Sequence, residues 1–165
     1  MRVFVTGASG FIGSHVTRAL LGKGHSVAVL ATPDDPLLRL QAMRDHFKVI
    51  TGMLGDVGIL QKALAEFQAE ACIHLAWYAE PGQYLHSMEN IQSLTESLTL
   101  LNVLINSGCR QVVMAGTCAE YDTEFGYLSE LTPTRPASLY ASAKLSCCLL
   151  GQQIAAQAKI NFAWG

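Results

Sequence analysis

The sequence predicts an α/β fold, a doubly wound parallel sheet with helices on both faces. Short, largely apolar runs alternate along the chain with longer stretches of helical spacing. Runs of this kind suit strands that are buried on both faces of a parallel sheet. Strand–helix alternation in turn implies right-handed crossovers within one sheet. A glycine-rich turn between the first run and the first helical stretch supports the same fold.

The apolar runs predict six strands, at residues 3–6, 26–30, 48–51, 71–75, 111–115 and 159–163. The helical spacing predicts four helices, at residues 11–21, 57–68, 87–107 and 139–158. Asp56 is expected to cap the second of these helices. In two segments the spacing of apolar residues is less regular. Residues 34–47 suggest a helix whose start is blurred by Pro33 and Pro36, and residues 120–136 suggest a loop beside the functional site.

Composition excludes several classes of protein. Of the 165 residues, 50% are hydrophobic and 15% charged, with a net charge of −2. A disordered chain has the opposite balance, and nucleic-acid binding calls for a larger basic surface. No apolar run approaches the roughly 20 residues of a membrane span. The five cysteines form no C-x-x-C pair, which predicts reduced thiols, a cytoplasmic location and no metal site.

The glycine-rich turn predicts a dinucleotide site of the Rossmann-like kind. Gly7, Gly10 and Gly13 allow a tight turn and the close approach of a pyrophosphate. The helix that starts at Phe11 and Ile12 then presents free N–H groups to the phosphates. A glycine-rich turn without a ligand is the alternative interpretation. The position of the motif between a strand and a helix favours the dinucleotide.

The G-x-x-G-x-x-G spacing resembles that of the short-chain dehydrogenase/reductase superfamily. Residues 73–77 (Ile-His-Leu-Ala-Trp) resemble the H-x-A segment of its extended, sugar-nucleotide-modifying branch. Residues 114–121 resemble the segment of that branch in which a hydroxyl, here Thr117, precedes a tyrosine by four residues. Tyr140 and Lys144 match its Y-x-x-x-K motif. Together these matches extend over nearly the whole chain.

The Y-x-x-x-K spacing suits proton transfer. Residues four apart share one face of a helix. An ammonium one turn from a phenol is expected to lower the pKa of the tyrosine, which suits an acid–base group acting on a sugar hydroxyl. The resemblance implies that Tyr140 is this group, that Thr117 bonds the same oxygen, and that Lys144 also holds the nicotinamide ribose. His74 is expected to be a packed histidine.

Other cofactor contacts follow from the resemblance. It implies that Leu75, Ala76 and Trp77 approach the cofactor, with the adenine beside Met53 and Leu54. At the end of the second strand, Thr32 stands where NAD-binding proteins usually have an acid. Arg39 is the first arginine beyond that strand, so no basic side chain is expected at a ribose 2′-phosphate. NAD is therefore the expected cofactor, and NADP is not excluded.

The resemblance implies an NAD(P)-dependent nucleotide-sugar epimerase or 4-keto-sugar reductase. A dehydratase is less favoured, because Cys118 follows Thr117 where dehydratases have an acidic pair. The alternatives are a non-catalytic dinucleotide-binding regulator or sensor, or a domain that serves association alone. A homodimer through residues 87–107 and 139–158 is expected, unless the Leu94, Leu98 and Leu101 stripe faces the sheet.

The length of the chain is about half of what the resemblance implies for such an enzyme. Residues 1–165 then correspond to the NAD(P)-binding domain, apparently truncated in the sixth strand, and the C-terminal substrate domain is absent. The expectation is that these residues alone bind dinucleotide weakly and turn over little substrate.

Overall fold

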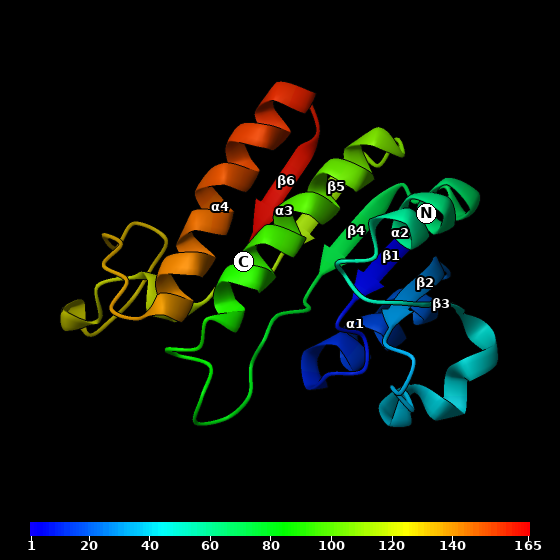
Figure 1. The fold of residues 1–165 in the computed structure, drawn as a ribbon, viewed down its shortest axis with the longest axis horizontal. Helices are drawn as coiled ribbons and strands as arrows, with labels where there is room; N and C mark the ends of the chain where they lie inside the picture. Colours follow the sequence, from blue (N-terminus) through cyan, green and yellow to red (C-terminus); the bar gives the residue numbers. More distant parts are fainter.

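A six-stranded parallel sheet forms the centre of the protein (Figure 1). The computed structural model describes all residues from 1 to 165. The strands are β1 (Arg2–Thr6), β2 (Ser26–Ala31), β3 (Lys48–Thr51), β4 (Ala71–His74), β5 (Gln111–Met114) and β6 (Asn161–Trp164). The helices are α1 (Phe11–Gly22), α2 (Val57–Phe67), α3 (Glu89–Asn106) and α4 (Leu139–Ala158), with 3-10 turns η1 (Leu38–His46), η2 (Cys118–Glu120) and η3 (Thr123–Phe125). The strand order β3-β2-β1-β4-β5-β6 is doubly wound, which confirms the predicted fold class.

Helices α2, α3 and α4 cover one face of the sheet. Figure 1 shows α3 and α4 lying side by side across the β4–β6 half. The larger hydrophobic core lies beneath these helices, where Phe4, Leu60 and Leu64 are fully buried together with Leu100 and Leu104. This helix layer places the amino end of α4 beside the carboxyl end of β5, where the site lies.

Helix α1 and the 3-10 turn η1 cover the other face, over β1, β2 and β3. Val5 and Val29 of these strands pack there with Leu37, Leu40 and Phe47. The uncertain segment 34–47 therefore contributes to the core, although only as 3-10 turns. Leu37 takes a left-handed backbone conformation, with φ at 49°. Bulky residues rarely adopt this conformation. The sequence pattern therefore does not indicate that the chain turns at Leu37 before η1 begins.

The leucine stripe of α3 faces the sheet. Leu101 is fully buried, and Leu94 and Leu98 pack at the edge of the same core. The alternative that this stripe belongs to the core is therefore the one seen in the structure. The large apolar side chains that remain exposed on the two long helices are Ile91, Leu149 and Leu150.

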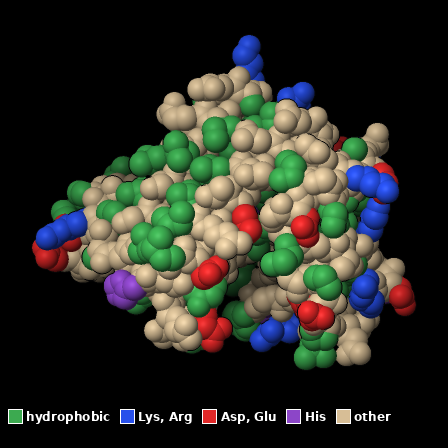
Figure 2. All heavy atoms as spheres, viewed as in Figure 1, with side chains coloured by type: hydrophobic (Ala, Val, Ile, Leu, Met, Phe, Trp, Pro, Cys, Tyr) green, Lys and Arg blue, Asp and Glu red, His purple; other side chains and the backbone are tan.

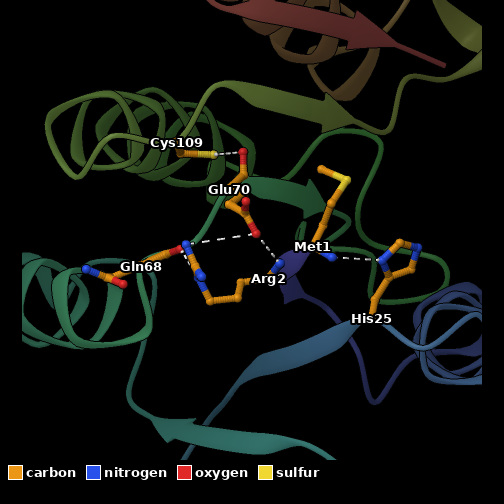
Figure 3. Close-up of polar contacts among 6 residues, drawn as sticks. All are labelled: Met1, Arg2, His25, Gln68, Glu70 and Cys109. Atoms are coloured by element: carbon orange, nitrogen blue, oxygen red, sulfur yellow. Dashed lines mark hydrogen bonds and ion pairs between the residues drawn. The ribbon is translucent and has the colours of Figure 1, made fainter.

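The amino ends of the strands are held together by polar contacts (Figure 3). The carboxylate of Glu70 accepts the Arg2 backbone N–H at 2.7 Å, and the Arg2 guanidinium donates to the Gln68 carbonyl at 2.7 Å. The Cys109 thiol contacts the Glu70 carbonyl at 3.5 Å. These contacts tie β1, β4 and β5 together at the end of the sheet opposite the functional site.

The surface carries no broad patch of one charge on the face seen in Figure 2, where acidic and basic side chains are scattered. Hydrophobic side chains are interspersed among them. None of the helices combines the length and the apolar character needed to cross a bilayer. All five cysteines are free thiols, and Cys118 is the exposed one.

Candidate active site

The carboxyl ends of β1, β4 and β5 converge on the predicted site. The turn after β1 begins at Gly7, whose backbone has φ at +67°. It lies so close to the segment after β4 that a Cβ on Gly7 would be 2.8 Å from the Ala76 nitrogen and from the Leu75 carbonyl carbon. Gly7, Leu75 and Ala76 therefore form one continuous floor, as expected for residues that approach a cofactor.

The amino end of α1 suits an anionic group. Gly10 occupies the N-cap position and has no side chain that could cap the helix. The N–H groups of Phe11, Ile12 and Gly13 are first-turn donors, which have no partner within a helix. The side chains of Phe11 and Ile12 are mostly exposed. A pyrophosphate fits this end of the helix, because backbone donors and the helix dipole both favour negative charge there.

His74 is a buried structural residue. Its Nδ1 lies 2.7 Å from the Thr6 hydroxyl, and its Nε2 lies 2.8 Å from the Ser97 hydroxyl. The Ser97 hydroxyl donates to the Ser93 carbonyl, so Nε2 carries the imidazole proton and Nδ1 accepts from Thr6. Burial, with a smaller contribution from Lys144, lowers the pKa of His74 to about 3. The neutral imidazole joins β1, β4 and α3, which confirms the packed role.

His74 predicts a pH-dependent stability. The folded state keeps the imidazole neutral down to about pH 3, whereas the unfolded chain binds a proton below about 6.5. The free energy of unfolding should therefore fall as the pH drops from 6.5, by up to about 1.4 kcal/mol per unit from this group. His74→Gln should flatten that slope, and the exposed His46→Gln serves as control. Denaturant unfolding at several pH values measures it; an equally steep slope in His74→Gln contradicts the assignment.

Tyr140 and Thr117 lie near each other, Tyr140 at the start of α4 and Thr117 just after β5. Ser138 caps α4 by accepting the Ala141 N–H at 3.1 Å, which places Tyr140 in the first turn. Thr117 follows β5, and its hydroxyl caps η2 by accepting the Ala119 N–H at 3.2 Å. Burial raises the pKa of Tyr140, and the nearby Thr117 side chain partly opposes this. The tyrosine and the hydroxyl predicted from the motif are therefore brought together.

Lys144 lies one turn further along α4 and is buried. Its ammonium donates to the Ala115 carbonyl at 2.7 Å and lies 4.2 Å from the centre of the Trp77 ring. Burial lowers the pKa of Lys144 to about 8. The expected lowering of the Tyr140 pKa by Lys144 is not found: burial dominates that pKa and Lys144 is not among the groups that shift it. The lysine instead holds the end of β5 against α4.

Aromatic rings and a buried amide support Tyr140 from the other side. The Tyr84 ring packs edge-on against Tyr140 at 4.9 Å between centroids. The Trp77 indole donates to the Asn90 side chain at 2.9 Å, and Asn90 donates to the carbonyls of Tyr84 and Ser87. Asn90 thus fixes the segment between β4 and α3.

A cavity of about 560 Å³ opens beside Thr117. Residues after Thr117 and in the loop predicted beside the site line it, including Tyr121, Tyr127 and Glu130. Trp164 of β6 closes one side. The loop expectation for 120–136 is correct in the main, although η3 and a bridge between Tyr121 and Thr134 give the loop some regular structure.

Asp56, near the residues expected beside the adenine, does not have the expected role of a helix cap. Its carboxylate does not cap α2; it folds back to accept the Met53 N–H at 2.7 Å, because the Asp56 backbone has ψ at 67° rather than an extended N-cap value. The Met53 side chain is 54% exposed and Leu54 packs against the core, so an apolar edge is present.

Arg39 lies closer to the glycine turn than sequence distance suggests. Thr32 is exposed at the end of β2, as expected. The Arg39 guanidinium donates to the Ser9 carbonyl at 3.3 Å, and the Arg18 guanidinium donates to the Arg39 carbonyl. Arg39 therefore lies beside the glycine turn, because η1 folds back over it.

Known proteins are similar to this chain in sequence and in fold. The family model described as the NAD dependent epimerase/dehydratase family matches residues 3–165. The chain is 30% identical to UDP-glucose 4-epimerase of Azospirillum brasilense, over 87% of this chain and 42% of that protein. It is 31% identical to dTDP-6-deoxy-L-talose 4-dehydrogenase (NAD(+)) of Aggregatibacter actinomycetemcomitans, over 87% of this chain and 52% of that protein.

Solved structures agree. UDP-glucose 4-epimerase of Thermus thermophilus in complex with NAD superimposes with a TM-score of 0.85 at 26% identity, covering 99% of this chain and 54% of the epimerase. The UDP-Glc/GlcNAc 4-epimerase of Campylobacter jejuni, at 19% identity, shares the fold with a TM-score of 0.88 over 99% and 52% of the two chains. The chain thus spans about half the length of the relatives that it matches. With its glycine turn, its Tyr140–Thr117 contact and a match over residues 3–165, the chain belongs to the NAD-dependent epimerase/dehydratase family.

Proposed function

We propose that this chain carries the NAD-binding and catalytic residues of a nucleotide-sugar epimerase or 4-keto-sugar reductase. The observation that supports this most is that Tyr140 lies near Thr117 and packs against Trp77, in the segment that follows β4 and contacts the glycine turn. A relative named UDP-glucose 4-epimerase and another named as a 4-dehydrogenase both match most of the chain. Both reactions exchange hydride and proton at a sugar carbinol, so one site serves either.

The chain's own residues have distinct tasks in this proposal. Bound NAD supplies the hydride acceptor. The first turn of α1 holds its pyrophosphate, and Leu75, Ala76 and Trp77 form the floor on which it rests. Tyr140 exchanges the proton of the sugar hydroxyl, and Thr117 orients that oxygen. Lys144 fixes the Ala115 carbonyl and holds the nicotinamide ribose.

The raised pKa of Tyr140 favours the protonated phenol at neutral pH. A phenol is the form that donates a proton to a 4-keto sugar, whereas oxidation of a hydroxyl needs the phenolate. We therefore expect the rate of sugar oxidation to rise with pH as Tyr140 ionises, and the reduction of a keto sugar to fall over the same interval. Rates of both directions against pH measure this. Oxidation that is independent of pH contradicts Tyr140 as the base.

Turnover of a panel of UDP- and dTDP-sugars in the presence of NAD distinguishes the proposal from its main rival. An epimerised sugar, or an oxidised sugar formed together with NADH, supports it. If the protein binds NAD but turns over none of these sugars, the dinucleotide-binding regulator is favoured instead. A homodimer through α3 and α4 is part of the proposal, with exposed Ile91, Leu149 and Leu150 as the available apolar contacts. Light scattering, which measures the mass of the particle in solution, distinguishes the dimer from a monomer.

A further inference from the structure

Glu120 is a buried carboxyl group without a role in the chemistry proposed above. It closes the 3-10 turn η2 after Thr117, and only 2% of the residue is exposed. One carboxyl oxygen accepts the Thr117 backbone N–H at 2.9 Å. The other accepts the indole N–H of Trp164 at 3.1 Å. Since a buried carboxyl is costly unless its oxygens are bonded, the two donors explain how Glu120 is accommodated there.

The hydrogen bonds suit the ionised form of Glu120. Both oxygens accept N–H groups, and neither donor can accept a proton in return. Burial raises the pKa of the Glu120 carboxyl, while the bonds from Trp164 and Thr117 and the charge of Lys144 lower it. The geometry therefore describes a negative charge enclosed within the wall of the cavity.

This charge reaches all three catalytic residues. Thr117 is held directly through its backbone N–H, and its own hydroxyl caps the same turn. The Lys144 ammonium lies 5.7 Å from the centre of the Trp164 ring, whose N–H bonds Glu120. The negative charge of Glu120 raises the pKa of both Tyr140 and Lys144. The charge of Glu120 is thus close enough to Tyr140 and Lys144 to influence both groups.

We propose that Glu120 is a positioning residue of this active site. Its carboxylate fastens the backbone of Thr117 to the end of β6 and places a negative charge near Tyr140 and Lys144. The proposal rests on the assignment of Tyr140 and Lys144 under the proposed function. It concerns the protonation of those residues, which is measurable without turnover.

Other titratable groups also face this cluster. Tyr84 and Cys118 raise the pKa of Tyr140, in addition to Glu120. Cys147 on the next turn of α4 raises the pKa of Lys144. These groups remain unchanged when Glu120 is replaced, so a substitution there isolates the charge of one carboxylate. The titratable groups whose pKa responds to Lys144 or Glu120 are His74, Glu120, Tyr140, Lys144, Cys147 and Cys148.

Glu120→Gln removes the charge and keeps one oxygen acceptor. Tyrosinate absorbance is followed against pH in the chain, and subtraction of the Tyr140→Phe titration isolates Tyr140. In Glu120→Gln the Tyr140 midpoint should move to lower pH by roughly one unit, because a nearby negative charge is lost. Glu66→Gln, which removes an exposed carboxylate paired with Lys48, is the matched control and should leave the midpoint in place.

An unchanged Tyr140 midpoint in folded Glu120→Gln overturns the proposal and leaves Glu120 a purely structural residue. A shift in Glu120→Gln together with no sugar turnover by any form of the protein supports the charge assignment and contradicts the proposed function, so the two failures are distinguishable. Trp164→Phe keeps the carboxylate and loses one donor. It should leave the midpoint much closer to that of the unsubstituted chain, whereas an equal shift would mean that packing is the cause and overturn the proposal.

A second measurement uses the unsubstituted chain, in case Glu120→Gln does not fold. Protonation of a carboxylate that bonds an indole changes the fluorescence of that indole. Fluorescence is followed during acid titration of the unsubstituted chain and of Trp164→Phe. The difference between the two curves should show a transition at a pH above the ordinary pKa of a glutamate. The absence of any Trp164 transition above that value overturns the assignment of Glu120 as an indole-bonded carboxylate.

Discussion

Gly13→Ala should unfold or severely destabilise the chain and abolish NAD binding. A Cβ at Gly13 would overlap the carbonyl oxygen of Gly7, and would lie 2.7 Å from the Gly7 carbonyl carbon and 2.8 Å from the Ala8 Cα. All three atoms are backbone, so no side chain can rotate to relieve the overlap. The turn and α1 must move apart, and overpacking of this kind costs about 1–3 kcal/mol or more. Denaturant unfolding and NAD titration measure both effects.

Gly58→Ala is the matched control for this substitution. Gly58 lies in α2, and a Cβ added to it would have no other atom within 4 Å. Alanine at such a helical position should stabilise the fold, by about 0.4–1 kcal/mol, mainly by restricting the unfolded chain. A Gly13→Ala chain as stable as the unsubstituted one, with NAD affinity retained, would contradict the close packing of the glycine turn against α1.

Tyr140→Phe should reduce turnover of the nucleotide sugar by about 10²- to 10⁴-fold, the usual contribution of a positioned acid–base group. The phenyl ring fills the same space beside Tyr84 and Trp77, so folding and NAD affinity should change little. Loss of rate with unchanged NAD affinity is therefore expected from steady-state kinetics and NAD titration with the same protein.

Tyr78→Phe provides the control for Tyr140→Phe. It removes a phenol from the same segment of the chain, next to Trp77, without touching the α4 motif. Its turnover should remain within a few-fold of the unsubstituted protein. Equal losses in the two variants would show that the effect on rate comes from packing around the segment between β4 and α3.

Sequence pattern was sufficient for those parts of the site that depend on local periodicity. The glycine turn between β1 and α1 and the Tyr140–Lys144 spacing on α4 require only a strand, a turn and a helix in order. The packed role of His74 also followed, because an apolar strand end indicated burial. Thr117 was located by the resemblance of residues 114–121 to a family segment, and the structure brings it near Tyr140.

Long-range contacts account for what the sequence did not reveal. Glu120 lies in a stretch without pattern, and its burial depends on Trp164, which follows it by 44 residues. Arg39 reaches Ser9 only because the left-handed Leu37 turns η1 back over the glycine turn. Lys144 was expected to act on Tyr140 from spacing alone, yet the Ala115 carbonyl and the Trp77 ring fix its ammonium. Side-chain direction of this kind is set by neighbours from other elements.

Direct transfer of hydride from a sugar to bound NAD tests the central claim. A nucleotide sugar that carries deuterium at the reacting carbon is mixed with the protein and NAD, and the reduced cofactor is recovered and analysed by mass spectrometry. The account predicts deuterium in the nicotinamide ring with the unsubstituted protein and its loss with Tyr140→Phe. Deuterium exchanged into water with none in the cofactor, or equal transfer by Tyr140→Phe, would contradict the account.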